Sequence, residues 1–308
     1  MTAPGAGSTR DALDRLRRRV AALGGLPTLP AIAAEVLRAA RDPAATVVDM
    51  TARIARDPPL AARVLKVANS ASYGMTRTVG SLSVACVLLG MKRIAGIAAN
   101  ASTFRTPLAG AAGAPPREAL WEHAAACAAA CDLLARRLKL DVVAEAFVTG
   151  LIHDIGTTVL DAVLHEDFER ILELAAAERI PLYEAERRML GTDHAHIGAW
   201  LAEAWNLPPQ IASAVAAHHG PPCDPGEAPL AAALQAADAA VRAAGLGFAR
   251  FSPPPSREEL SARPLFAGAA YDWDELETRA AAAASEAREF LAAAGNPARP
   301  SQGARQEL

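Results

Sequence analysis

Aromatic residues are scarce in this sequence of 308 residues, and the alternating patterns of β-strands are essentially absent. Phe, Trp and Tyr together make up 5% of the chain, whereas alanine is abundant. Alanine is the strongest helix former, and its small side chain lets helices pack closely. The sequence therefore predicts an all-α fold, a helical bundle of two lobes.

A basic stripe is also lacking. The formal net charge is −3 and the isoelectric point is near 6.2. Lysine occurs only at Lys66, Lys92 and Lys139, and the remaining basic residues are arginines. Proteins that bind nucleic acid usually carry a basic patch or have an isoelectric point above about 9. We therefore expect no nucleic-acid partner.

The four cysteines form no Cys-x-x-Cys pair. Cys127 and Cys131 lie one helical turn apart in an alanine-rich segment, as small buried side chains commonly do. The N-terminal residues have no apolar stretch of the kind found in secretory signals. Val84 to Met91 is the longest apolar run, and it is far shorter than the roughly 20 residues that span a membrane. These features predict a cytoplasmic protein without a membrane partner.

Runs rich in Gly, Pro and small polar residues divide the chain. The predicted parts are a partly disordered extension over 1–18, a first lobe over 19–105, a linker over 106–116, a second lobe over 117–245, a loop and C-terminal helix over 246–294, and a disordered tail over 295–308. Hydrophobic periodicity and capping residues predict helices over 10–22, 31–41, 46–56, 58–67, 81–101, 117–138, 141–163, 166–178, 182–190, 194–205, 208–218, 228–244 and 272–294. Residues 251–270 have no clear period and are expected to form a loop.

All seven histidines fall in the second lobe: His123, His153, His165, His194, His196, His218 and His219. A single helical histidine is more often a core or surface residue than a ligand. The pair His153-Asp154 is different because it interrupts the apolar run 147–156. Burying an ionisable pair there is costly unless it is paired or bound to a metal. Glycines on both sides of the pair indicate close helix packing.

Two other elements have more than one interpretation. His218-His219 ends a predicted helix, where a protonated histidine is stabilised by the helix dipole, so the pair could serve only as a C-cap. Asp238 lies in an apolar stretch and is either a solvent-exposed helical residue or a ligand. His and Asp are common metal ligands, so a shared metal pocket is the alternative to these separate structural roles.

The second lobe resembles the HD superfamily, whose metal-dependent phosphohydrolases share the order H…HD…D. That order falls on His123, His153, Asp154 and Asp238 in this sequence. The extra histidines of the HD-GYP phosphodiesterases are matched by His194, which Gly198 follows four residues on, and by His218-His219. The resemblance implies a divalent metal, Fe, Mn or Mg, held by these seven residues. It implies one metal at the first four residues and a second supported by the other histidines.

The first lobe resembles the HDOD family. The motifs are LPTLP at 26–30, DPPL at 57–60, NSASYG at 69–74 and Leu89-Gly90, with DHAHIG at 193–198 and WNLP at 205–208 in the second lobe. The resemblance covers about 19–245. HDOD proteins look like HD phosphohydrolases but are mostly described as bacterial signalling modules. The resemblance implies a stand-alone regulatory protein that binds a signalling protein or a small ligand such as a nucleotide.

Two departures from the HD-GYP pattern bear on activity. Thr157 stands where those enzymes carry a lysine, so this position offers no fixed cation to a phosphate or a developing oxyanion. The G-Y-P motif is missing, because Gly220-Pro221-Pro222 follows His218-His219. We therefore favour a regulatory role and assign no catalytic residue. A metal-dependent phosphohydrolase of the HD type is the alternative.

Overall fold

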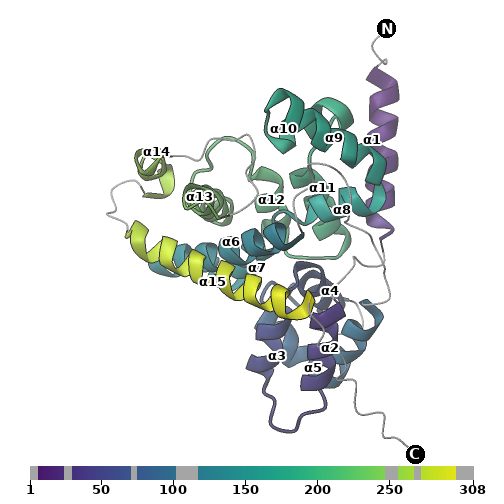
Figure 1. The fold of residues 1–308 in the computed structure, drawn as a ribbon, viewed down its shortest axis with the longest axis vertical. Coiled ribbons are helices and arrows are strands. Elements are labelled where there is room, and N and C mark those ends of the chain that lie inside the picture. Colours follow the sequence, from purple (N-terminus) through teal and green to yellow (C-terminus); the bar gives the residue numbers. More distant parts are fainter. Residues whose placement is uncertain are drawn as a thin grey trace, which may run out of the picture.

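The computed structural model describes residues 6–23, 30–70, 75–101, 117–246, 256–266 and 272–295 (Figure 1). These residues form helices and contain no β-strand, which confirms the all-α fold class. The helices are α1 (Ala6–Ala21), α2 (Pro30–Ala39), α3 (Val47–Ile54), α4 (Pro58–Ala68), α5 (Leu82–Ala101), α6 (Arg117–Arg137), α7 (Val143–Ile152), α8 (Ile155–Val163), α9 (His165–Glu178), α10 (Leu182–Leu190), α11 (His194–Ala204), α12 (Pro209–Ala217), α13 (Pro229–Ala243), α14 (Arg257–Ser261), the 3₁₀ turn η2 (Pro264–Phe266) and α15 (Trp273–Gly295). Most of LPTLP, part of NSASYG, the linker 106–116 and the tail beyond 295 lie outside the described residues. The division of the chain into lobes stays a prediction.

Two predicted helices are interrupted, and one predicted loop is partly helical. The single helix expected over 141–163 is wrong, because α7 ends at Ile152 and α8 begins at Ile155. The helix from 82 to 101 contains Gly90 with φ 71° and ψ 160°, a conformation that glycine adopts without strain. Within 251–270, the described residues form α14, which a Ser256–Glu259 capping box starts, and η2.

The segment Val143–Val163 is long and apolar enough to cross a membrane by length and composition alone. It, and not Val84–Met91, is therefore the longest candidate span. In the folded protein 72% of its most apolar window is buried, and the chain breaks at His153-Asp154 within it. The segment is therefore the core of the helical bundle.

Helix α6 is the centre of the larger group of helices. It packs against α7, α13 and α15, and α15 runs alongside it (Figure 1). Arg137 of α6 pairs with Glu275 at 2.5 Å, and Arg288 of α15 pairs with Glu122 at 2.8 Å. The C-terminal helix is therefore part of the packed structure.

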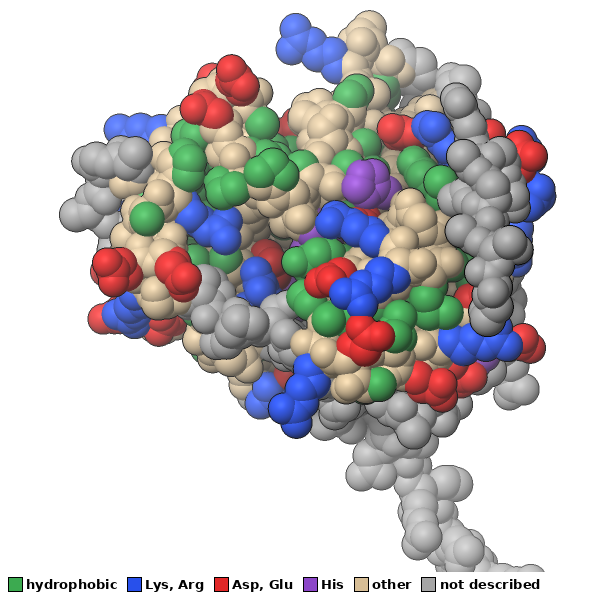
Figure 2. Space-filling model, turned by 90° about the horizontal axis from the view of Figure 1, so that it is seen from above, with side chains coloured by type: hydrophobic (Ala, Val, Ile, Leu, Met, Phe, Trp, Pro, Cys, Tyr) green, Lys and Arg blue, Asp and Glu red, His purple; other side chains and the backbone are tan. Residues whose placement is uncertain are grey.

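Helices α2 to α5 pack on one another at the other end of the molecule (Figure 1). One continuous apolar core nevertheless runs from Leu16 to Ala284. On the face seen in Figure 2, acidic and basic side chains are interspersed, and no large area of Lys and Arg is visible there. This face has no basic stripe of the kind that tracks a nucleic-acid backbone.

Helix α4 begins at a buried N-cap. The Asp57 carboxylate is fully buried and accepts a hydrogen bond from the Leu60 N–H at 2.9 Å. We expect Asp57→Ala to lower the free energy of unfolding by about 2 kcal/mol, at the upper end for N-caps, because water cannot replace the lost acceptor. The exposed cap Thr46 of α3 is the control, and Thr46→Ala should cost about 1 kcal/mol or less. Urea denaturation measures both, and equal losses would contradict the role of burial.

Candidate metal centre

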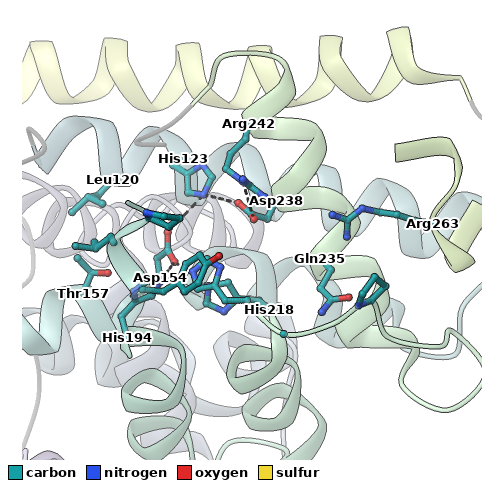
Figure 3. Close-up of a pocket in the computed structure, with 16 residues that line it drawn as sticks. Leu120, His123, Asp154, Thr157, His194, His218, Gln235, Asp238, Arg242 and Arg263 are labelled. Carbon is teal, nitrogen blue, oxygen red and sulfur yellow. Dashed lines mark hydrogen bonds and ion pairs between the residues drawn. The ribbon is translucent and has the colours of Figure 1, made fainter. Parts of the chain in front are cut away.

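All seven residues predicted for the site lie together in the larger group of helices, around α6. His123 comes from α6, His153-Asp154 from the α7–α8 junction, His194 from the start of α11, His218-His219 from the end of α12, and Asp238 from α13. Six of them line one cavity of about 430 Å³ (Figure 3), and the Nε2 atom of the seventh, His153, lies 3.2 Å from Asp154 Oδ2. Their coordination of a metal stays a prediction, but their convergence around one point is a feature of the fold.

Close helix crossings put His153-Asp154 between α6 and α11. A Cβ atom placed on Gly150 would lie 2.5 Å from the Cys127 carbonyl oxygen of α6. One placed on Gly156 would lie 1.9 Å from the His194 carbonyl oxygen of α11. Only glycine permits backbones to approach this closely. The two glycines therefore allow the junction to reach ligands on both neighbouring helices, as the sequence predicts.

Asp154 is at the centre of the imidazole cluster. Its Oδ2 lies 3.2 Å from His153 Nε2 and 3.6 Å from His123 Nε2. Its Oδ1 lies 3.3 Å from His194 Nε2 and 3.4 Å from His218 Nε2. Its side chain is 22% exposed, and the exposed part faces the cavity. Each carboxylate oxygen thus faces two imidazole nitrogens at the edge of a space large enough for a ligand.

Hydrogen bonds of Nδ1 orient the same four imidazole rings. His153 Nδ1 donates to the Gly150 carbonyl at 2.8 Å, and His218 Nδ1 donates to the Val215 carbonyl at 2.7 Å. The remaining two contacts are His194 Nδ1 to Glu186 Oε2 at 2.7 Å and His123 Nδ1 to the Leu246 carbonyl at 3.3 Å. A carbonyl cannot donate, so Nδ1 carries the proton, and in a neutral ring Nε2 carries the lone pair.

These lone pairs are the observation that tests whether a metal fits. His218 Nε2 is buried and has no hydrogen-bond partner in the described part of the chain, although Asp154 Oδ1 is only 3.4 Å away. His194 Nε2 and His219 Nε2 lie 2.9 Å apart. The second contact is a hydrogen bond in which His219 Nε2–H can donate to His194 Nε2. In a neutral ring, an Nε2 lone pair that faces the Asp154 carboxylate is repelled by it unless a proton or a metal cation lies between the two atoms. Ligating histidines are typically held through the other ring nitrogen in this way, so the residues fit a divalent metal.

The ligand atoms form two groups, each within 4.8 Å. One consists of His123, Cys127, His153 and Asp238, and the other of Asp154, His194, His218 and His219. Either group can hold a metal ion. The sequence pattern predicts that Asp154 shares a metal with His123, His153 and Asp238. In the structure Asp154 belongs to the group of His194, His218 and His219, and its other oxygen also lies near His123. The grouping of N, O and S donors suits a borderline metal such as Fe or Zn as well as Mn.

Both carboxylates of the centre stay ionised. Burial opposes the charged form of Asp154, but neighbouring histidines, His153 first, hold its pKa well below the ordinary value. Burial acts the same way on Asp238, and Arg242 and His123 outweigh it, so that its pKa is also lowered. Burial raises the pKa of the Cys127 thiol to about 11, so this group is protonated at neutral pH. Burial opposes protonation of His153, but Asp154 outweighs it and raises the His153 pKa, so a divalent cation at Asp154 would replace protons that the histidines hold in its absence.

Several site residues were missed by sequence reasoning. Cys127 was interpreted as a small core residue, yet its Sγ lies 3.5 Å from His123 Nε2, one helical turn away. Arg242 follows Asp238 by one turn, and its Nε donates to Asp238 Oδ2 at 3.1 Å. Spacing along a helix could have indicated both. Arg263 also lines the cavity, and no local signal in the sequence pointed to it.

Other expectations about single residues are now decided. Asp238 is buried and faces His123 Nε2 at 3.3 Å, so it is not a solvent-exposed helical residue. Thr157 lines the cavity without charge, as expected from the missing lysine. His165 and His196 lie outside the cluster and pair with Asp161 and Asp193.

Comparison with known proteins identifies the family and the fold. The model of the HDOD domain matches residues 26–221. A protein from Treponema pallidum (strain Nichols), described as uncharacterized, is 28% identical over 219 residues, which is 70% of this chain but 42% of that protein's length. This chain thus spans less than half of that relative.

Two solved structures share the fold. The MmoQ response regulator from Methylococcus capsulatus strain Bath is 25% identical, with a TM-score of 0.68 over 82% of this chain and 98% of that one. An HDOD domain protein with unknown function from Geobacter sulfurreducens is 26% identical, with a TM-score of 0.56 over 92% and 98%. The family match spans more than half of the sequence and the folds agree, so this chain belongs to the HDOD domain family.

Proposed function

We propose that this chain is a cytoplasmic regulatory protein whose histidine cavity binds a divalent metal ion. The observation that carries the proposal is the convergence of four oriented imidazole Nε2 atoms on the Asp154 carboxylate. Buried acceptors that bind the Nδ1–H of an imidazole fix the ring orientation of a ligand set before the metal binds. A metal in the cavity is then available to a small ligand, whose binding is the signal.

The regulatory part of the proposal has two supports. The similar protein from Methylococcus capsulatus is a response regulator, and this chain shares its fold over most of its length. Helices α2 to α5 also expose large apolar side chains: Val84 and Val87, three residues apart on α5, and Val48 on α3. Exposed apolar side chains that form a patch are common where a protein partner binds. A signalling protein is the partner that we propose, without nucleic acid or membrane.

Metal-dependent phosphohydrolysis is the second candidate. It is favoured by the exposure of Asp154 to the cavity, because a catalytic metal keeps a coordination position open towards substrate. A divalent metal would supply Lewis-acid chemistry to a phosphoryl group there. Against this candidate, Thr157, which lines the cavity, provides neither a cation nor a strong proton acceptor.

Metal content and turnover distinguish the two functions. We expect the purified full chain to contain Mn or Fe by elemental analysis, or to bind Mn²⁺ on titration. We expect no turnover of phosphomonoesters or cyclic dinucleotides with Mn²⁺ or Fe²⁺. Robust hydrolysis that Asp154→Ala abolishes would overturn the regulatory proposal in favour of a phosphohydrolase. A chain that neither contains nor binds metal would contradict both.

A further inference from the structure

The cavity has a second charged wall, opposite the histidines. Figure 3 shows Arg242 and Arg263 directed towards Asp238 on one side, whereas Asp154, Thr157 and His194 lie on the other. Arg242 is paired with Asp238 at 3.1 Å. This wall therefore carries two guanidinium groups and one carboxylate.

Arg263 has no counter-ion of its own in the described part of the chain, because Asp238, the carboxylate that acts on it, is already paired with Arg242. No ion pair or hydrogen bond of its guanidinium occurs there, although the side chain is partly buried and faces the cavity. The neighbouring segments 247–255 and 267–271 contain no Asp or Glu that could supply one. Burial, followed by the nearby positive charge of Arg242, lowers the pKa of Arg263, and Asp238 offsets only part of this effect. A partly buried cation that shares one carboxylate with a second cation is incompletely neutralised, and a bound anion would complete the charge balance.

Arg263 is held in place by apolar anchors on both sides. Leu260 at the end of α14 and Leu265 and Phe266 of η2 are buried, and the Phe266 ring packs edge-on to Trp273 at 4.7 Å. Both short elements contact α13, the helix that carries Asp238 and Arg242. The backbone at Arg263 is thus fixed relative to the metal centre, as a recognition site requires.

We infer that Arg263, together with Arg242, forms an anion-recognition wall that binds the phosphate of a small phosphate monoester in the cavity. Arginine is suited to this because its planar fork matches phosphate oxygens and stays charged. A cavity of about 430 Å³ is within the ordinary range for small-molecule sites and has room for a mononucleotide. The inference rests on the proposed metal centre for the opposite wall.

The arginine wall lies outside the part of the chain that the family model matches. The HDOD match ends at residue 221, whereas Asp238, Arg242 and Arg263 all follow it. Apolar lining for the rest of the ligand comes from Leu182 and Tyr183, the ring of Tyr183 stacking on His219 at 4.4 Å. The ligand would therefore have its phosphate at the arginines and metal, and a ring or apolar group beside Tyr183.

Isothermal titration of the full chain with inorganic phosphate and with a nucleoside 5′-monophosphate tests the inference. Arg263→Gln removes the guanidinium and keeps a polar side chain. We expect it to weaken binding of both probes about 10-fold or more, since charge-assisted hydrogen bonds to phosphate are lost. Arg257→Gln is the matched control: Arg257 lies on α14 and pairs with Asp274 and Glu277, away from the cavity. It should bind both probes like the wild type.

Mn²⁺ titration of the same three proteins separates this inference from the proposed function. Equal Mn²⁺ affinity with weaker phosphate binding by Arg263→Gln supports both. Phosphate binding that depends on Arg263 without any Mn²⁺ binding supports the arginine wall and contradicts the metal centre. Mn²⁺ binding with no phosphate binding by the wild type, or with equal phosphate binding by Arg263→Gln, overturns the arginine wall and leaves the metal centre. Failure of both ligands to bind overturns both.

Discussion

Asp154→Asn is expected to abolish metal binding while leaving the helical fold intact. The Asp154 carboxylate lies within 3.6 Å of four imidazole nitrogens and belongs to one ligand group while reaching the other. Asparagine keeps its shape but removes the charge that attracts a cation. Loss of a group that only hydrogen-bonds to a metal ligand already costs about 10- to 100-fold in metal affinity, so loss of this proposed central ligand should cost about 100-fold or more. Titration with Mn²⁺ measures the loss, and circular dichroism checks the fold.

Asp161→Asn is the matched control. Asp161 lies on α8 and is more buried than Asp154, but its carboxylate pairs with His165 outside the cavity. Its replacement should leave Mn²⁺ affinity unchanged. Wild-type affinity in Asp154→Asn would show that the imidazoles do not form a metal site.

Thermal unfolding gives the same test without a binding assay. A metal at 100 times its dissociation constant stabilises the folded state by about 2.7 kcal/mol, which raises Tm by roughly 5 °C or more in a chain of this size. We expect this increase in the wild type and in Asp161→Asn, and its absence in Asp154→Asn. Because the comparison is made within each protein, with and without metal, it is independent of any direct effect of the substitution on stability.

The order of ligand types could be predicted from the sequence, but their grouping could not. His123, His153-Asp154 and Asp238 follow a pattern that one family shares. Hydrophobic periodicity correctly placed His123 and Asp238 in helices, but it placed His153-Asp154 inside a single helix that the structure divides in two. Which carboxylate oxygen meets which imidazole depends on how α6, α11 and α12 meet around the α7–α8 junction. That arrangement is set by tertiary packing, which a one-dimensional pattern does not contain.

The break between α7 and α8 is a second feature that the sequence pattern did not predict. Residues 143–163 contain no proline, and their apolar periodicity continues through His153-Asp154, so a single helix was the natural prediction. In the structure Asp154 has φ −94° and ψ 11°, which ends one helix and begins the next. Neighbouring residues of a regular helix point about 100° apart. The break removes that restriction, and both side chains of the pair can then contact the same cluster.

The position of Arg263 in the cavity could not be predicted from local sequence patterns. Its segment was expected to be a loop, and neither its spacing nor its neighbours suggested a role. Its position follows from the buried anchors Leu260 and Phe266, which attach α14 and η2 to α13. The family pattern stops earlier in the chain, so only the fold could bring this guanidinium to the cavity.

Gly156→Ala is expected to disrupt both the fold and the metal centre. The added Cβ would lie 1.9 Å from the His194 carbonyl oxygen and 2.8 Å from the Gly198 nitrogen, and both atoms belong to the backbone of α11. Backbone atoms cannot rotate away, so α8 and α11 must separate. Overpacking of this kind costs about 3 kcal/mol or more, or about 6 °C or more in Tm. Because His194 belongs to the proposed ligand set, the separation should also weaken Mn²⁺ binding.

Gly96→Ala provides the matched control for this effect. Gly96 is an exposed residue of α5, and nothing lies within 4 Å of the position that its Cβ would take. Alanine is favoured over glycine in a helix by about 1 kcal/mol, so this variant should be as stable as the wild type or more so, with unchanged Mn²⁺ affinity. Equal Tm values for the two variants would mean that the α8–α11 crossing relaxes at little cost. A loss of stability in Gly156→Ala with full Mn²⁺ affinity would mean that His194 is not among the ligands, because its backbone is the first to move.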